Sequence, residues 1–195
     1  MRLQKLFITT LLSVSVIGTA IPANVSAASY ATTKRTYTLK VAGKKQKKKA
    51  RGAIYNGKTI KTKAPGFLRG DTTMYSASYV FQKGLGVSYS YSSKTWKITL
   101  KKGSKTITMK RGSKYAYVNG KKKKLPTPAR RVYSYKQKKN YIYVPGEFCA
   151  KNLGYSYSWS SSSYAGTIST SNSNKASSSV TTLPATNGEH YVQRC

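Results

Sequence analysis

The chain has 195 residues, of which 36 are lysine or arginine and three are acidic, so its net charge is +33. A single histidine and two cysteines accompany these acids, a composition that argues against a metal centre, which needs clustered ligands. It also argues against a glycosidase, which needs a pair of carboxylates. A surface whose charges are almost all positive attracts polyanions through an electrostatic field that salt screens. The alternative is that lysine only solubilises a sheet and protects its edges.

The first 27 residues have the pattern of a secretory signal. Arg2 and Lys5 form the charged start, an apolar run covers Leu6–Ile21, and Val25-Ser26-Ala27 resembles a small-residue cleavage site. An uncleaved membrane anchor is the alternative. No other stretch is apolar enough to span a bilayer, so we expect an exported protein that is soluble or wall-associated.

Residues 28–52 are predicted to form a lead-in strand and a basic loop. Tyr37, Leu39 and Val41 alternate with polar residues, which is typical of a strand with one buried face. The basic run Lys44–Arg51 follows, at a hairpin or loop. After it, Asn56-Gly57 is a strong signal for a two-residue hairpin.

The rest of the predicted folded region is an internal repeat, with one copy in residues 53–118 and another in residues 119–169. Leu85-Gly86 recurs 68 residues later as Leu153-Gly154, and Ser88-Tyr89-Ser90 recurs as Ser156-Tyr157-Ser158. Each copy contains a short strand, a short helix and a strand of alternating aromatic residues. The predicted fold class is α+β, with antiparallel β-sheet units each packed on a short α-helix in two related repeats.

The helices follow from apolar residues spaced along one helical face. Pro145 suits the first helical position, Glu147 suits the first turn, and Gly86 and Gly154 suit the helix ends. Cys149 lies on the apolar face and is expected to be buried, while a disulfide to Cys195 remains an alternative. The expected structural core comprises Val80, Phe81, Leu85, Gly86, Trp96, Phe148, Leu153, Gly154 and Trp159.

Between and after the helices, further strands are expected at Trp96–Leu100, Ile107–Met109 and Lys114–Val118. Asn119-Gly120 predicts a second two-residue hairpin before a basic stretch. Tyr133 and Tyr135 are interpreted as part of a lysine-rich connector before the second helical unit. From about residue 170 to residue 195 the chain is rich in serine, threonine and asparagine, which indicates a linker or tail.

With this layout, the sequence resembles the copper amine oxidase N-terminal-like domain, or stalk domain, of surface proteins in Gram-positive bacteria. The matching residues are Asn119-Gly120-Lys121, Tyr141–Pro145, Phe148 and Leu153-Gly154, followed by the aromatic strand to Trp159. The resemblance covers residues 35–169. It implies an antiparallel sheet wrapped on a short helix, used as a non-catalytic spacer or wall-associated module, and it implies no copper or other cofactor.

The predicted function is therefore that of a secreted, non-catalytic cell-envelope module that binds anionic polymers by charge and acts as a spacer. The expected ligand is teichoic acid or an acidic polysaccharide of a Gram-positive wall, and nucleic acid would bind without specificity. The expected polyanion-binding residues are Lys44, Lys45, Lys47, Lys48, Lys49, Arg51, Lys121, Lys122, Lys123, Lys124, Arg130, Arg131, Lys136, Lys138 and Lys139.

Two alternatives stay open at this stage. The chain could be the non-catalytic front of a longer exported enzyme, such as a cell-wall hydrolase. It could also be a host-directed adhesin, because Arg69-Gly70-Asp71 spells a receptor-recognition tripeptide, although the repeat layout already requires a turn before a strand at these residues. Asp71 and Glu147 are carboxylates of the predicted folded region, and a turn role and a helix-start role account for them.

Overall fold

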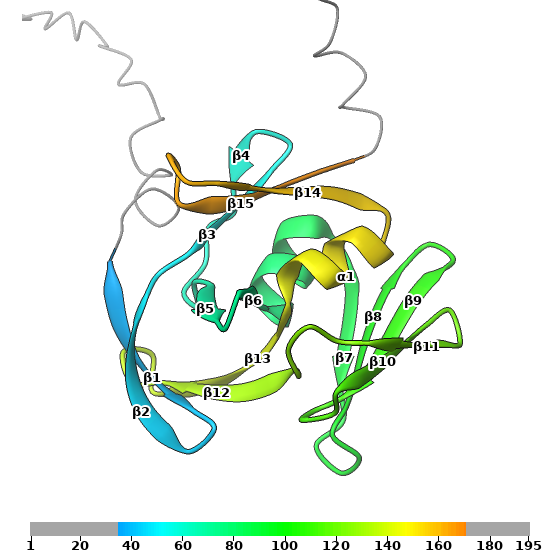
Figure 1. Ribbon diagram of the computed structural model, residues 1–195, viewed down its shortest axis with the longest axis horizontal. Helices are drawn as coiled ribbons and strands as arrows, with labels where there is room; N and C mark the ends of the chain where they lie inside the picture. Colours follow the sequence, from blue (N-terminus) through cyan, green and yellow to red (C-terminus); the bar gives the residue numbers. More distant parts are fainter. Residues whose placement is uncertain (1–34, 171–195) are drawn as a thin grey trace, which may run out of the picture.

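The computed structural model describes residues 35–170, which form three β-sheets around two central helices (Figure 1). Almost all strand pairs are antiparallel, which confirms the α+β class and the antiparallel sheets. No helix in this part of the chain is long and apolar enough to cross a membrane. The predicted signal, the tail and Cys195 lie outside the described residues.

The largest sheet has six strands in the order β2-β1-β12-β13-β6-β5. Its strands are β1 (Thr36–Val41), β2 (Lys44–Lys49), β5 (Phe67–Arg69), β6 (Thr72–Ser76), β12 (Arg130–Ser134) and β13 (Lys139–Pro145). The basic run expected at a hairpin or loop is mainly the edge strand β2, the second strand of the β1–β2 hairpin. The supposed connector around Tyr133 is the β12–β13 hairpin, because Val132 and Ser134 alternate with exposed residues and are buried.

The two smaller sheets lie on either side of the helices. One has the order β11-β10-β9-β8-β7 and the other has the order β14-β15-β3-β4. Their strands are β3 (Gly52–Tyr55), β4 (Lys58–Thr59), β7 (Ser88–Tyr91), β8 (Lys97–Lys102), β9 (Lys105–Lys110), β10 (Tyr115–Val118), β11 (Lys121–Lys124), β14 (Tyr155–Ser160) and β15 (Ala165–Thr170). β3 and β15 pair in parallel, which joins the first predicted repeat to the second.

The predicted hairpins at Asn56-Gly57 and Asn119-Gly120 are confirmed. All four residues have positive φ, between 45° and 79°, as the tight turn that suits a twisted hairpin requires. The two turns join β3 to β4 and β10 to β11. In both cases a local sequence signal sets the pairing of the strands.

The two helices are η1 (Ala77–Gly84), which has the wide π-helical turn, and α1 (Gly146–Asn152). The Oγ of Ser76 accepts a hydrogen bond from the Tyr79 N–H and caps η1. Pro145 is not the first helical residue, because its backbone is still extended and it ends β13. Glu147 lies in the first turn as predicted, and Gly86 and Gly154 follow the helices with φ of 68° and 81°.

The main core packs the helices between the sheets. It contains Val80, Phe81, Leu85 and Leu153 as predicted, and Phe148 is half-buried against it. Trp96 was wrongly placed in the core, because its side chain is 47% exposed. Trp159 is only half-buried and stacks on an arginine. Gly86 is exposed, so its role is in the turn and not in packing.

Tyr75 lies at the centre of the fold. Its hydroxyl donates to the Gly52 carbonyl at 2.6 Å and accepts from the Gly166 N–H at 2.9 Å. It therefore links β6 to the parallel strands β3 and β15. Its ring leaves no space for a side chain at Gly66 or Gly146, where a Cβ would lie 2.5 Å and 2.3 Å from ring carbons.

Several features recur 68 residues apart. β8 and β15 begin and end at equivalent residues by this offset. Ser92 Oγ accepts the Thr95 N–H, and Ser160 Oγ accepts the Ser163 N–H. Trp96 and Tyr164, which precede β8 and β15, have φ of 58° and 51°. β6 and β13 lie side by side, with Val144 opposite Tyr75 and Tyr143 opposite Ser76.

Cys149 is fully buried in the main core, as predicted, and burial raises the pKa of its thiol far above the ordinary value. Because the thiolate is the reactive form, we expect no labelling of Cys149 by a maleimide at neutral pH in the native protein. A Cys195→Ser variant would isolate this thiol, and labelling in denaturant would serve as the positive control. Rapid labelling of the native variant would contradict the burial of this side chain.

Candidate polyanion interface and neighbouring clefts

The outer face of strands β2, β1 and β12 forms a basic surface, which we call the basic face. Residues directly opposite each other in antiparallel strands share one face. Lys40 of β1 lies opposite Lys45 on one side and Tyr133 on the other. Its neighbours Leu39 and Val41 point the other way, into a second hydrophobic core that also contains Phe67 and Tyr143. The basic face comprises Lys40, Lys45, Lys47, Lys49, Tyr133 and Tyr135.

The lysines of the basic face have a regular spacing. Lys45, Lys47 and Lys49 alternate along β2 and are all exposed, so strand geometry separates neighbouring charges by about 7 Å. At one end Lys45 Nζ lies 5.2 Å from the centroid of the Tyr135 ring. The Tyr135 ring meets Tyr133 edge to face, and Tyr135 is 39% exposed. This arrangement offers a row of cations beside an aromatic pair.

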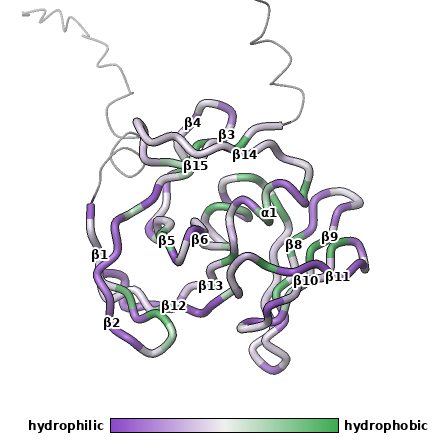
Figure 2. The backbone as a smooth tube through the Cα atoms, in the orientation of Figure 1, coloured by the Kyte–Doolittle hydropathy of each residue, from purple (hydrophilic) through white to green (hydrophobic). Residues whose placement is uncertain are grey.

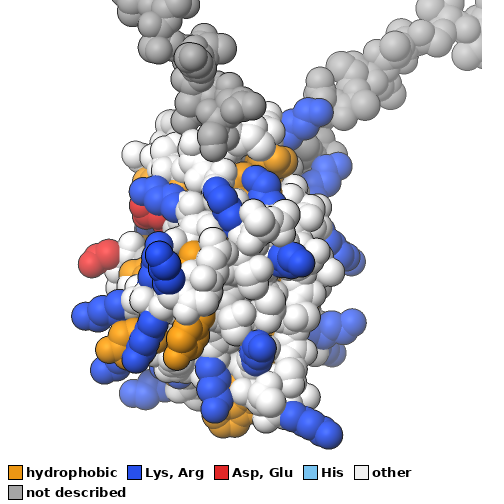
Figure 3. Space-filling view, turned by 90° about the vertical axis from the view of Figure 1, so that its right-hand side faces the viewer, with side chains coloured by type: hydrophobic (Ala, Val, Ile, Leu, Met, Phe, Trp, Pro, Cys, Tyr) orange, Lys and Arg blue, Asp and Glu red, His pale blue; other side chains and the backbone are white. Residues whose placement is uncertain are grey.

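The second lysine run lies elsewhere. Lys121–Lys124 form β11, which is an edge strand of the five-stranded sheet. β11 lies on the other side of the helices from β2 (Figures 1 and 2). Lys122 Nζ lies 4.4 Å from the Tyr115 ring centroid, and Lys123 Nζ donates to Asn152 Oδ1 at 2.8 Å. Figure 3 shows lysine and arginine from top to bottom of the face that it draws. The charge is therefore distributed and not gathered in one patch.

The remaining predicted residues divide between several places. Lys44 and Lys48 belong to β2 but point away from the basic face, because they lie opposite Val41 and Tyr37. Lys136 and Lys138 lie in or beside the β12–β13 turn, and Lys139 opens β13. Lys40 lies on the basic face but is not among the predicted residues, although its alternation with Leu39 and Val41 was an available signal.

Arg51 lies in a groove of about 780 Å³ between β6, α1 and β14. Its guanidinium carbon is 4.2 Å from the Trp159 ring centroid, and its Nη1 donates to Thr73 Oγ1 at 2.9 Å. Because a stacked and hydrogen-bonded guanidinium is held in place, Arg51 is not part of the basic face. The prediction had grouped it with the lysines of β2 because it follows them in sequence.

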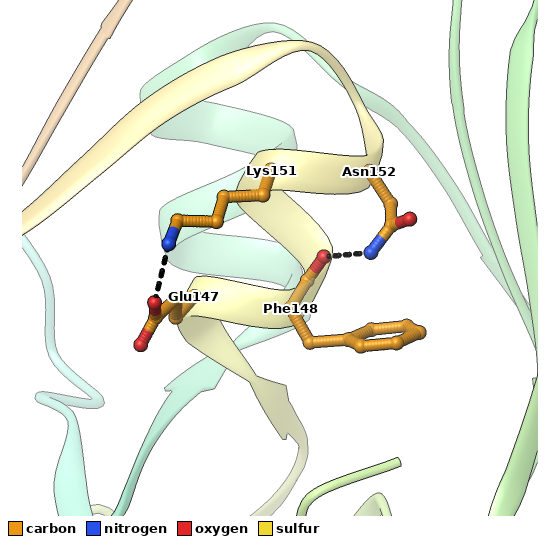
Figure 4. A network of polar contacts seen from close by, with 4 residues as sticks. All are labelled: Glu147, Phe148, Lys151 and Asn152. Carbon is orange, nitrogen blue, oxygen red and sulfur yellow. Dashed lines mark hydrogen bonds and ion pairs between the residues drawn. The ribbon is translucent and has the colours of Figure 1, made fainter. Parts of the chain in front are cut away.

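Asp71 and Glu147 line the same groove, although sequence alone did not bring them together. The Glu147 carboxylate accepts a hydrogen bond from Lys151 Nζ at 2.7 Å, and both side chains are more than half exposed (Figure 4). On the same helix, Asn152 Nδ2 donates to the Phe148 carbonyl at 2.8 Å. Glu147 therefore has the helix-surface pairing expected for its position.

Arg69-Gly70-Asp71 forms the turn between β5 and β6, with Gly70 at φ 56°. Arg69 is only partly exposed, and its Nη1 is buried without a hydrogen-bond partner among the described residues. Since a receptor must reach the arginine of this tripeptide, the geometry favours the turn role over adhesion.

Residues 54–170 match the family described as the copper amine oxidase N-terminal domain. The chain belongs to this family. The copper amine oxidase N-terminal domain thus begins within β3 and ends with β15, while β1 and β2 precede it. No curated protein and no solved structure matches the chain.

The name of this domain refers to a copper enzyme, and a copper site would require suitable ligands among its residues. Copper in proteins is held mainly by imidazole and thiolate ligands. The single histidine of the sequence, His190, lies outside the described residues. Between residues 35 and 170 no three His, Cys, Asp or Glu side chains are grouped to hold a metal. The described residues therefore do not fit a copper centre.

Proposed function

We propose that this protein is a secreted, non-catalytic module of the cell envelope of a Gram-positive bacterium. It binds anionic wall polymers such as teichoic acid through charge and acts as a spacer. The observation that carries the proposal is the basic face, where four exposed lysines and two tyrosines lie together without an acidic residue. The described acids, Asp71 and Glu147, both line the separate groove.

The binding mechanism follows from the geometry of the basic face. A flexible polyanion lies along β2 and releases its counterions as phosphate or carboxylate groups approach the lysines. Exposed tyrosine rings beside the cations add contact with sugar or polyol carbons. Because each exposed pair contributes little, affinity arises from several simultaneous contacts and falls steeply as salt increases.

The spacer role rests on the repeated architecture and on the family. We infer that the two halves are related repeats, because β8 and β15, the serine-capped turns before them and the positions of Trp96 and Tyr164 all correspond at one offset. The halves share the main core, and β3 pairs with β15. This interlocked unit is suited to holding a partner domain at a fixed distance.

A second candidate function is supported by the description of the family, which is the N-terminal domain of an enzyme. In this alternative the protein is the accessory part of a longer exported enzyme, such as a wall hydrolase. The binding surface would then keep that enzyme at its polymeric substrate. The nucleotide sequence that follows the codon for Cys195 distinguishes the two candidates.

The proposal is tested by co-sedimentation of the purified protein with cell walls, before and after removal of teichoic acid, across a salt series. We expect binding to depend on teichoic acid and to weaken steeply with salt. A Lys45→Gln/Lys47→Gln/Lys49→Gln variant should bind about tenfold more weakly, since three exposed charge contacts of roughly 0.5 kcal/mol each are lost.

The matched control is Lys121→Gln/Lys122→Gln/Lys124→Gln, which removes the same charge from β11. A smaller loss in this control places binding on the basic face. Equal losses would show that overall charge alone governs binding. Binding that is insensitive to salt and to teichoic acid would overturn the proposed function.

A further inference from the structure

A small hollow lies beside the β1–β2 hairpin, apart from the lysines of the basic face. Its volume is about 290 Å³. It is lined by Ala42, Gly43, Trp96, Arg111, Gly112, Arg130 and Arg131. Three arginines and an aromatic ring thus meet in one concavity, although they come from the turn before β8, the end of β9 and the start of β12.

Within residues 35–170, the arginines of this hollow have no acidic partner. The ion pair found among the described residues joins Lys151 to Glu147, and Asp71 lines the other groove. A fourth guanidinium, that of Arg69, lies close to Arg130. Burial, and then the charge of Arg130, lower the pKa of Arg69. Like charges held together raise the free energy of the folded state, and a bound anion would remove that repulsion.

Arg130 also has an unmet hydrogen-bonding need. Its Nε is buried and has no hydrogen-bond partner in the described part of the chain. A buried donor without an acceptor raises the free energy of the folded state. The guanidinium of Arg130, which lines the hollow, is therefore not fully held by hydrogen bonds to the surrounding protein.

Trp96 gives the hollow an aromatic wall. Its side chain is 47% exposed, and the guanidinium carbon of Arg111 lies 4.4 Å from its ring centroid. Its φ of 58° is unfavourable for a bulky residue, but the equivalent Tyr164 shares this conformation, so the turn itself explains the strain. What the turn does not explain is the large apolar surface that Trp96 leaves exposed.

From these observations we propose that the hollow is a phosphate subsite for the anionic polymer, in which Arg111, Arg130 and Arg131 hold one phosphate group and the adjoining polyol or sugar carbons lie on Trp96. The inference rests on the proposed function and adds a specific site to it. Planar guanidinium groups donate paired hydrogen bonds to phosphate oxygens. A phosphate group offers more acceptor oxygens than a carboxylate, which matches a site lined by three guanidinium groups.

The experiment uses the full chain with Trp159→Phe, which leaves Trp96 as its one tryptophan. Inorganic phosphate is titrated while Trp96 fluorescence is followed, against sodium chloride at matched ionic strength. We expect a saturable change with phosphate alone. Arg111→Lys keeps the charge but removes the paired N–H donors of the guanidinium. It should weaken phosphate binding about tenfold, because one charge-assisted contact is lost. Arg131→Lys, at an exposed position, provides a second variant that should fold normally.

Lys58→Gln is the control, because it removes an exposed charge of β4 that lies outside both the hollow and the basic face, and it should leave the phosphate titration unchanged. Identical responses to phosphate and chloride, or an Arg111→Lys variant that binds phosphate normally, would overturn the subsite. Salt-dependent wall binding together with such a result would leave the proposed function intact. Conversely, saturable phosphate binding without wall binding would support the hollow as a site for free phosphate and overturn the proposed function.

Discussion

Replacement of Gly146 by alanine is expected to destabilise the protein by about 2 kcal/mol or more, the range typical of overpacked cores. Gly146 is the first residue of α1 and is buried. A Cβ there would lie 2.3 Å and 2.7 Å from ring carbons of Tyr75 and 3.1 Å from the Thr73 carbonyl oxygen. The Tyr75 ring cannot move away, because its hydroxyl is bonded to β3 and β15.

Packing and helix propensity predict changes of opposite sign in the stability of this variant. In an unconstrained helix, alanine is more favourable than glycine by about 1 kcal/mol, so helix propensity alone predicts stabilisation. Urea unfolding followed by circular dichroism measures the change in the free energy of unfolding. Glu147→Ala, at the next helical position, is the control and should change stability by at most about 0.5 kcal/mol. An alanine at position 146 that stabilises the protein would contradict the packing around Tyr75.

Strong alkali is expected to unfold this protein because many tyrosines are buried in the neutral form. Burial raises the pKa of Tyr75, Tyr143 and Tyr37 well above the ordinary value. Burial, and then the neighbouring Tyr55, raise the pKa of Tyr155 to about 12. Burial, and then Tyr91, raise that of Tyr89 to about 12.

The direction of the pH dependence follows from proton binding. In the unfolded chain tyrosine titrates near pH 10, whereas these groups keep their protons in the folded protein. As pH rises from about 10 through 12, the unfolded state therefore binds fewer protons, and the folded state loses stability. One unit of pKa difference corresponds to about 1.4 kcal/mol, so several tyrosines together weaken the fold substantially.

Ultraviolet absorbance of tyrosinate measures this ionisation directly. We expect the buried tyrosines to ionise only together with unfolding seen by circular dichroism. A Tyr89→Phe variant should retain the cooperative step with a smaller amplitude. A single ionisation near pH 10 with the protein still folded would contradict the burial of the tyrosines.

Local signals accounted for much of the fold. Asn56-Gly57 and Asn119-Gly120 specify their turns without help from the rest of the chain, because few other residue pairs accept two positive φ angles. The spacing of Val80, Phe81 and Leu85 identified the buried side of η1. Local patterns could not identify which distant strands pair with each other, such as β3 with β15, which pair in parallel across more than a hundred residues.

The errors have physical causes. Trp96 continues the alternation of Ile98 and Leu100, but the positive φ at Trp96 turns it out of the strand and into solvent. The lysines of β2 have weak strand propensity, and backbone pairing with β1 overrides it. The arginine hollow brings together residues from separate elements, so only the fold could reveal it.

The parallel pairing of β3 with β15 has a mechanical consequence. A tension that reaches the start of β3 and the end of β15 pulls these neighbouring strands past each other, because they run in the same direction. Their backbone hydrogen bonds are then loaded together in shear and not opened one at a time, and the hydroxyl of Tyr75 clamps both strands to β6. The fold should therefore resist stretching between β3 and β15, which would suit the proposed spacer role.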